Sequence, residues 1–456
     1  MFADNFMITM QTHELAQVLN GQSLGDDVVF NGVSTDSRQL HGGELFVALH
    51  GENFDGHTFV DRARDAGAAA LLLDHEVNTE LPAVHVTDTR AALGQLATDW
   101  RRRFKLPVVA VTGSNGKTTV KEMLSHILGS KDDVLATQGN LNNDIGVPLT
   151  LFRLGAEHKY AVIEMGANHA GEIAGLVQIA QPAVALITQC APAHLEGFGS
   201  IEGVARAKAE IYSGLAANGT AVINADDDYA ELWLQLSRGK KQLLFGLQQS
   251  ADVYAGNINF NADASSQFEL VTPAGSADVQ LPLAGQHNIM NALAAAAAAT
   301  ALGIATPVIA ARLARLQPVA GRLVRVAGRN GSLILDDTYN ANPGSLRAAL
   351  EVLVALPARP WLVLGDMGEL GAEAEALHAA AGEQARALGV ERLYGVGELS
   401  RAAVDAFGAG GRHYSDVDAL NAALTEELAA GVVMLVKGSR SSRMERVIAA
   451  QRLAAS

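Results

Sequence analysis

A glycine-rich segment at residues 112–119 contains the side chains best suited to hold a phosphate chain. It reads Thr-Gly-Ser-Asn-Gly-Lys-Thr-Thr, and its glycines allow the backbone to curl so that N–H groups face phosphate oxygens. Lys117 has the reach for β- and γ-phosphates, and the Thr118 hydroxyl is a suitable Mg²⁺ ligand. We therefore predict that the whole segment binds a nucleotide: Thr112, Gly113, Ser114, Asn115, Gly116, Lys117, Thr118 and Thr119.

The flanking sequence supplies the elements that must position this segment. Val108–Val111 is an apolar run typical of a buried strand, and it leads directly into the loop. From Val120 the apolar residues follow at i+3, i+4, i+7 and i+8, which indicates a helix whose N-terminus adds positive potential. A general P-loop has a longer spacing between its glycines than the two residues found here, so an ordinary strand–helix turn is the alternative.

Three further segments place polar groups at expected strand ends, where doubly wound folds have their sites. Glu164 directly follows the apolar run Ala161–Ile163, which suits a Mg²⁺ ligand; the alternative is an N-cap for the next helix. His194 and Lys208 lie in a second segment, and taken alone they would be a structural histidine and a surface lysine. The third, residues 137–148, is an amide- and glycine-rich loop and only weakly suggestive.

Apolar runs and turn residues divide the chain into three α/β blocks. Residues 1–87 read as a small α/β domain. Residues 88–317 begin with a helical connector and then alternate strands with helices, which predicts a doubly wound parallel sheet with helices on both faces. Residues 318–456 repeat that alternation and predict a second, Rossmann-like domain.

Composition limits the classes of function. The net charge of −15 argues against nucleic acid as a partner. The single Cys190 excludes an intrachain disulfide and a Cys-based zinc site, and it suits a reducing cytosol. The N-terminus does not read as a signal peptide, and the alanine-rich stretch 292–311 reads as a buried helix and its exit rather than a membrane span. We expect a cytoplasmic monomer.

Taken together, the segments resemble the Mur ligases, which form peptide bonds with ATP. The resemblance extends over essentially the whole chain and includes motifs in all three blocks. The matching segments are 112–119, Gly139-Asn140, Glu164-Met165-Gly166, His194 to Lys208, Gly285 to Ala292 and Asp336 to Asn340.

The resemblance implies a role for each candidate residue. Lys117 would hold the ATP phosphates, Thr118 and Glu164 would bind Mg²⁺, and His194 would touch a second Mg²⁺. Lys208 resembles the lysine that is carbamylated in related ligases, where the added CO₂ makes it a carboxylate-like metal ligand. The remaining nucleotide contacts would be Asn291 at the adenine, and Arg322 and Asp337 from the third domain. The alternative role for Asn291 is that of a helix cap. The alternative for Arg322 is an exposed residue at a domain joint.

Substrate contacts follow from the same resemblance. The first block resembles the domain that holds the UDP end of the substrate in the third- and fourth-step ligases, with Ser34 and Arg38 as candidates; Arg38 paired with Asp36 in a turn is the alternative. Asn140 in the amide-rich loop is a further candidate. Asn340 and Asn342 are candidates for contacts to the incoming amine substrate or to ATP.

The third block indicates which Mur ligase this chain resembles. Its turn reads Tyr-Asn-Ala-Asn-Pro at 339–343, and the chain lacks the Asp-Asn-Pro-Arg of ligases that add diaminopimelate. With residues 365–371 and 437–440, this favours the member that joins D-Ala-D-Ala to UDP-MurNAc-tripeptide. The alternatives are the preceding ligase, which adds L-lysine or diaminopimelate, the more distant folylpolyglutamate synthase, and a non-catalytic nucleotide-binding protein or switch.

Overall fold

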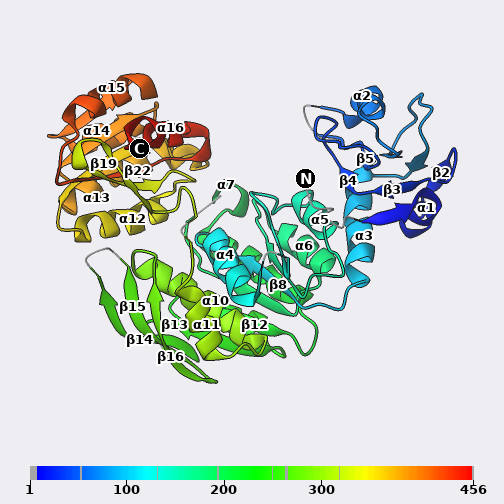
Figure 1. The fold of residues 1–456 in the computed structure, drawn as a ribbon, viewed down its shortest axis with the longest axis horizontal. Helices are drawn as coiled ribbons and strands as arrows, with labels where there is room; N and C mark the ends of the chain where they lie inside the picture. Colours follow the sequence, from blue (N-terminus) through cyan, green and yellow to red (C-terminus); the bar gives the residue numbers. More distant parts are fainter. Residues whose placement is uncertain are drawn as a thin grey trace.

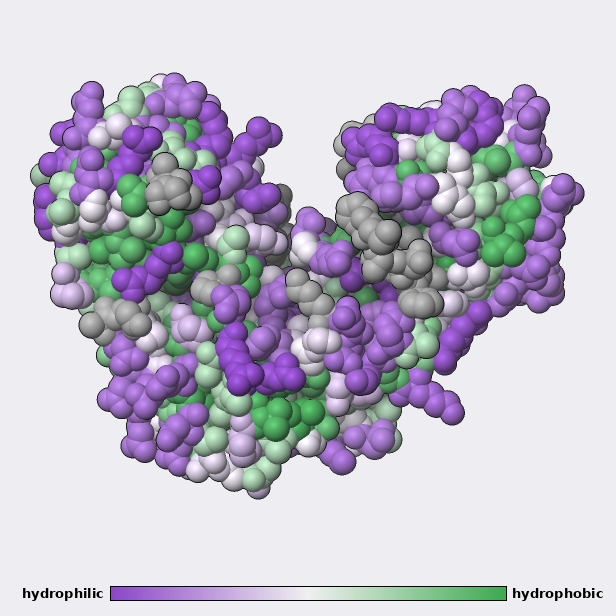
Figure 2. Space-filling model, in the orientation of Figure 1, coloured by the Kyte–Doolittle hydropathy of each residue, from purple (hydrophilic) through white to green (hydrophobic). Residues whose placement is uncertain are grey.

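The protein folds into three α/β domains that follow one another along a curved molecule (Figure 1). The structure is a computed structural model, and it describes residues 8–51, 54–130, 132–192, 195–248, 250–261, 265–317 and 319–453. The first domain, in blue, and the third, in orange and red, lie at opposite ends, with the central domain between them. Figure 2 shows that an open gap separates the two end domains above the central one.

The first domain contains two small sheets. One pairs β1 with β3 in antiparallel fashion, and the other has the strand order β2-β7-β6-β5-β4, parallel except for β2. Its elements are β1 Thr9–Gln11, α1 Thr12–Leu19, β2 Gln22–Leu24, β3 Val29–Asn31, β4 Val33–Ser34, β5 Leu45–Val47, η1 Gly56–Phe59, α2 Val60–Asp65, β6 Ala70–Leu73 and β7 Ala83–His85.

The central domain is built on a sheet of nine strands in the order β16-β15-β14-β13-β12-β11-β8-β10-β9. Its strands are β8 Val108–Thr112, β9 Val134–Ala136, β10 Tyr160–Glu164, β11 Val184–Ile187, β12 Thr220–Asn224, β13 Lys241–Gly246, β14 Val253–Phe260, β15 Ser266–Thr272 and β16 Gly275–Leu281. Its helices are α3 Thr89–Arg102, α4 Lys117–Leu128, α5 Gly146–Leu151, α6 Glu172–Ala180, α7 Leu195–Phe198, α8 Ile201–Ala209, η2 Glu210–Gly214, α9 Ala230–Leu236, α10 Gln286–Ala301 and α11 Thr306–Leu313.

Two features of the central domain differ from the sequence-based expectation. The sheet is mixed, because β15 runs antiparallel to both β14 and β16. These strands have polar exposed positions and lack the long apolar runs by which the parallel strands were found. The alanine-rich stretch forms the buried helix α10, as predicted, but a second helix, α11, follows at Thr306 with Pro307 in its first turn.

The third domain has a six-stranded sheet in the order β17-β18-β22-β19-β20-β21, parallel except for β17 at one edge. The predicted Rossmann-like alternation of strands and helices is confirmed. Its elements are β17 Val324–Ala327, η3 Arg329–Gly331, β18 Leu333–Asp337, α12 Pro343–Ala355, β19 Arg359–Gly365, η4 Gly371–Glu373, α13 Ala374–Ala387, β20 Arg392–Val396, α14 Ser400–Phe407, β21 Gly411–Tyr414, α15 Val417–Glu427, β22 Val432–Lys437, η5 Arg440–Ser442 and α16 Glu445–Gln451.

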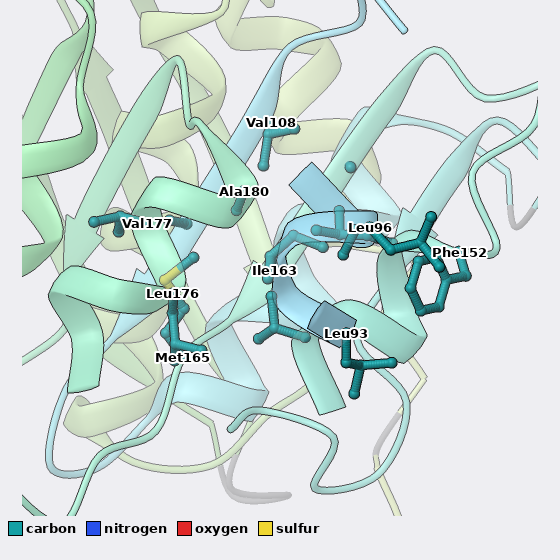
Figure 3. Packing of buried hydrophobic residues seen from close by; sticks show 14 of the residues in the cluster. Leu93, Leu96, Val108, Phe152, Ile163, Met165, Leu176, Val177 and Ala180 are labelled. Atoms are coloured by element: carbon teal, nitrogen blue, oxygen red, sulfur yellow. The ribbon is translucent and has the colours of Figure 1, made fainter. Parts of the chain in front are cut away.

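One hydrophobic core continues from the first domain into the central domain. Buried residues of α1 and β5 belong to the same cluster as Leu93 and Leu96 of α3 and the residues under one face of the central sheet. Figure 3 shows this packing at α3, β8, β10 and α6, with Leu93, Leu96, Val108, Phe152, Ile163, Met165, Leu176, Val177 and Ala180 labelled. The two faces of the third sheet carry separate clusters.

Polar contacts of α3 strengthen the same junction. Gln95 Nε2 donates to the carbonyl of Val18 at 2.7 Å, so α3 is bonded to the first domain. Arg101 Nε donates to the carbonyl of Ala180 at 3.0 Å, so α3 is also bonded to the central domain. No helix in the described part of the chain combines the length and apolar character needed to cross a bilayer.

Candidate functional site

The glycine-rich loop connects the end of β8 to the start of α4, as the sequence predicts. Gly113 has φ 149° and Gly116 has φ 84°, both in the region that favours glycine. A Cβ added at Gly113 would lie 1.8 Å from Thr188 Oγ1, and one at Gly116 would lie 2.4 Å from Asn291 Oδ1. The loop is therefore a tight backbone cradle that ends at a helix N-terminus, which is the form of a phosphate site.

This geometry predicts the effect of adding one methyl group. In Gly116→Ala the new Cβ would be forced against Asn291, and the residue would be strained at its positive φ. We expect nucleotide affinity to fall at least ~10-fold. The strain at this residue would cost about 1–3 kcal/mol, which the loop could relieve only by moving away from its binding conformation. Equilibrium binding of labelled ATP would measure this. Gly239→Ala, with φ 84° but open space around its Cβ, is the matched control and should bind nucleotide normally.

Lys117 is the first residue of α4, and its ammonium group points back over the loop. Its Nζ donates to the carbonyls of Gly113 at 2.6 Å and Ser114 at 3.4 Å. Burial lowers the pKa of Lys117, partly offset by the carboxylate of Glu164. Within the described ranges Lys117 forms no direct ion pair, so this partly buried cation lacks the close anionic partner that a phosphate chain would supply.

Glu164 lies at the end of β10, next to β8, and faces the loop. Thr118 Oγ1 donates to Glu164 Oε2 at 2.9 Å, and Asn142 Nδ2 donates to Glu164 Oε1 at 2.9 Å. Glu164 does not cap the next helix, because α6 begins at Glu172 with Gly171 as its N-cap. The hydroxyl and the carboxylate form a compact set of oxygen donors, which is the chemistry that Mg²⁺ prefers.

Lys208 lies on α8 and is buried, with 3% of its surface exposed. The alternative of a surface lysine is therefore wrong. Burial, together with the nearby cation of Lys117, lowers its pKa to about 7. A substantial fraction of such a lysine is neutral at pH 7 and can act as a nucleophile toward CO₂. His194, the other candidate from this segment, lies outside the described residues.

Residues from α10 and the third domain also lie close to the loop. Asn291 is in the second turn of α10 and is not its cap, because Gly285 is the N-cap. The guanidinium of Arg322 lies 4.2 Å from the centre of the Tyr339 ring, and its buried Nε has no hydrogen-bond partner among the described residues. An unsatisfied buried donor beside Lys117 suits an anionic ligand at this position.

Asp337 and the asparagines of the following turn have partners within the protein. Asp337 pairs with the buried ammonium of Lys437, which also donates to the carbonyl of Asn340 at 3.0 Å. Asn342 is the N-cap of α12, and its side chain donates to Asn115 Oδ1 at 2.6 Å. The third domain therefore makes direct contact with the P-loop through one pair of asparagines.

The candidates in the first domain lie away from this centre. Ser34 ends β4, and its hydroxyl donates to the carbonyl of Asp36 at 3.1 Å. Arg38 is exposed and pairs with Asp36 at 2.8 Å, and this hydrogen-bonded arginine lowers the pKa of Asp36 to about 2. The pairing with Asp36, weighed above as an alternative, is thus present. Asn140 is an exposed residue of the amide-rich loop, outside the contacts of Glu164.

Two residues at the centre were not singled out from the sequence. Thr188 follows β11, and its hydroxyl donates to the carbonyl of Asn115 at 2.5 Å, which fixes the loop. Asn142 holds Glu164, as described above. Little in the sequence marked them as site residues. Thr188 was only the residue after a strand, and Asn142 was one amide among several in a long loop.

Comparison with known proteins is consistent with this arrangement. Three family models match in order: the Mur ligase family catalytic domain at residues 29–101, the Mur ligase middle domain at 111–299 and the Mur ligase glutamate ligase domain at 321–440. The chain is 48% identical to the UDP-N-acetylmuramoyl-tripeptide–D-alanyl-D-alanine ligase of Escherichia coli (strain K12), over 97% of this chain and 98% of that protein.

Solved structures agree with the sequence comparison. MurF from Acinetobacter baumannii superposes with a TM-score of 0.91 and 37% identity, covering 97% of this chain and 99% of that one. MurF ligase from Thermotoga maritima, solved in complex with ADP, gives a TM-score of 0.80 and 30% identity over 92% and 96% of the two chains. The three domain models match in chain order and the identity extends over nearly the whole length, so this chain belongs to the Mur ligase family.

Proposed function

We propose that this chain uses ATP to join D-alanyl-D-alanine to UDP-N-acetylmuramoyl-tripeptide, giving UDP-MurNAc-pentapeptide, ADP and phosphate. The observation that carries the proposal is the near full-length identity of 48% to a ligase of that name. The geometry around Lys117 supports the ATP-dependent chemistry. We further propose that the protein works as a monomer in the cytoplasm. ATP and a UDP-linked precursor would both be present in that compartment.

The reaction requires activation of a carboxylate, which is a poor acyl donor. The terminal carboxylate of the tripeptide attacks the γ-phosphorus of ATP, the bond to the β-phosphate oxygen breaks, and an acyl phosphate and ADP result. The amine of D-Ala-D-Ala then attacks the acyl carbon, and a tetrahedral intermediate forms. Its collapse expels inorganic phosphate, the amine loses a proton, and the amide bond remains.

Residues of the loop would supply most of the catalytic stabilisation. Lys117 and the backbone N–H groups of 112–119 would bind the phosphates and neutralise charge that develops on the transferred phosphoryl group. Two bound Mg²⁺ ions would add further neutralisation. Thr118 and Glu164 would bind one ion, and by family resemblance His194 would touch the second and carbamylated Lys208 would be a further metal ligand. The Thr118–Glu164 hydrogen bond already brings the first two of these ligands together.

The third domain would deliver the amine and help to exclude water. Arg322 and Asp337 would face the nucleotide, while Asn291 would contact its adenine. Asn340 and Asn342 lie on the turn that precedes α12, beside the P-loop, and are our candidates for the dipeptide or the nucleotide. Exclusion of water matters because it would otherwise hydrolyse the acyl phosphate.

The first domain would hold the UDP end of the precursor, with Ser34 and Arg38 as contacts. Asn140, in the amide-rich loop of the central domain, would be a further substrate contact. Arg38 is 70% exposed, so it is open to a ligand, but it would have to share or exchange its present partner Asp36. A bidentate guanidinium is well suited to a diphosphate, which favours that exchange.

An omission experiment tests the proposal. Phosphate release is measured with purified protein, ATP, Mg²⁺, UDP-MurNAc-tripeptide and D-Ala-D-Ala, and each component is left out in turn. We expect release only with the complete mixture, and loss of release when D-Ala-D-Ala is replaced by L-lysine or diaminopimelate. Release with UDP-MurNAc-dipeptide plus a diamino acid would instead identify the preceding ligase. No release with any mixture would contradict both assignments.

A further inference from the structure

A cluster of histidines in the first domain takes no part in the nucleotide site. His50, His57, Asp74 and His75 each offer one ligand atom, and these atoms all lie within 4.8 Å of one another. We propose that this cluster is a binding site for a divalent transition-metal ion of the Zn²⁺ type. It is separate from the Mg²⁺ chemistry of the P-loop, and it does not depend on the proposed substrates.

The topology of the small sheet brings these residues together. Strands β5 and β6 are parallel neighbours, with Val47 paired to Leu72, so both chains leave the sheet at the same edge. His50 follows β5, and Asp74 and His75 directly follow β6. Asp55 then caps the short helix η1 by accepting the backbone N–H of His57, which turns the His57 side chain toward the same edge.

His57 has the surroundings of a metal-binding histidine. Its side chain is buried, with Nδ1 2.7 Å from Asp55 Oδ1 and Nε2 3.3 Å from Asp74 Oδ1. A ligating imidazole usually donates one ring N–H to a carboxylate and presents the other nitrogen to the ion. Among the described residues, the Nε2 atom accepts only the backbone N–H of Asp74, at 3.3 Å, so a metal ion would replace a long hydrogen bond.

The other two rings lie around the same point. The centre of the His57 ring is 3.7 Å from that of His75 and 5.8 Å from that of His50, and the latter two are 5.6 Å apart. Asp74 Oδ1 is also 3.0 Å from His75 Nδ1. The donors are therefore close enough that small side-chain movements would place them all on one ion.

The chemistry of the donors selects the class of ion. Imidazole nitrogens suit Zn²⁺, Cu²⁺ and Ni²⁺, whereas Mg²⁺ and Ca²⁺ prefer oxygen ligands. A carboxylate within the sphere and a second one behind His57 would offset the charge of the ion.

The test is a Zn²⁺ titration of the full chain, purified without a histidine tag, stripped of metal and kept in buffer with Mg²⁺. Calorimetry would measure affinity, and elemental analysis after dialysis would measure bound zinc. The variants are His50→Ala/His75→Ala and, as control, His13→Ala. His50, His75 and His13 have side chains 56%, 45% and 55% exposed, and His13 also lies beside a carboxylate, so the substitutions are matched.

We expect the native chain and His13→Ala to bind about one Zn²⁺ per chain, and the double variant to bind it at least ~100-fold more weakly. Asp55→Asn should cause a smaller loss, about 10-fold, because it acts through His57. Zinc should also raise the Tm of the native chain and leave that of the double variant unchanged. Equal zinc affinity in the native chain and the double variant would overturn the proposal. So would the absence of binding to the native chain at about 100 µM Zn²⁺, about the weakest level that would count as a site.

Discussion

Lys117→Met should lower kcat for ATP-dependent ligation by at least ~10³-fold. The partly buried ammonium of Lys117 has only backbone carbonyls as hydrogen-bond partners within the described ranges, and it lies where the transferred phosphoryl group would develop charge. Methionine keeps the length and apolar contacts of the stem but supplies no charge, so the loss should come from the chemistry. Phosphate release under saturating substrates would measure kcat, and equilibrium binding would measure the affinity for ATP.

The control for this variant is Lys159→Ala. Lys159 is an exposed lysine of the same domain that pairs with Asp133 at 2.6 Å, and its loss should leave kcat within about 2-fold of the native value, as surface pairs contribute little. Circular dichroism of both proteins would show whether the fold is intact. A folded Lys117→Met protein with native turnover would contradict the assignment of the P-loop as the catalytic ATP site.

Lys208→Ala should lower kcat at least ~100-fold, and small carboxylates such as acetate should restore part of the activity. The reason is that a carbamylated lysine acts as a carboxylate, which a diffusible carboxylate can partly replace in the space left by the side chain. Burial lowers the pKa of Lys208 from 10.5 to about 7, so the neutral amine that reacts with CO₂ is well populated at physiological pH. Lys208→Arg, which keeps a charge but cannot be carbamylated, should be inactive and should not respond to acetate.

The sign of the pH effect follows from the same shift. Below about pH 7 the lysine is protonated and cannot react with CO₂, so activity in the presence of bicarbonate should increase as the pH rises through 7. Arg206→Ala on the same helix is the control, because Arg206 is exposed and pairs with Glu202 at 2.7 Å. If Lys208→Ala kept native activity at every pH, a metal-ligand role for this residue would be wrong.

Much of the fold could be predicted because the parallel strands are buried on both faces. Val108–Val111 and Val184–Ile187 are continuous apolar runs, and such runs are readily recognised without any alternation. The antiparallel strands β14–β16 were missed, since they are half exposed and their apolar positions are separated by polar ones. Helix α11 was missed because Gly303 and Pro307 suggested the end of a helix rather than a break between two.

The candidate site was predictable where residue type and position carry the chemistry together. The loop at 112–119 and Glu164 directly follow apolar strands, so their placement needs only the rule that sites lie at the carboxyl ends of parallel strands. Contacts between distant segments could not be predicted in that way. The bond between Asn115 and Asn342 and the pairing of Asp337 with Lys437 depend on how two separate sheets approach each other.

The continuous core between the first two domains has a consequence for how the reactants can move. Leu93 and Leu96 of α3 belong to a cluster that includes residues of both domains, while the clusters of the third domain include just one described residue of the central domain, Ala284. A rotation of the first domain against the central one would have to open that shared packing, whereas a rotation of the third domain about the connection before β17 would leave most of its own packing intact. On the proposed assignment, the acyl donor and the nucleotide therefore keep a fixed separation in one rigid body. The incoming amine is then the only reactant whose arrival can be timed by a domain rotation.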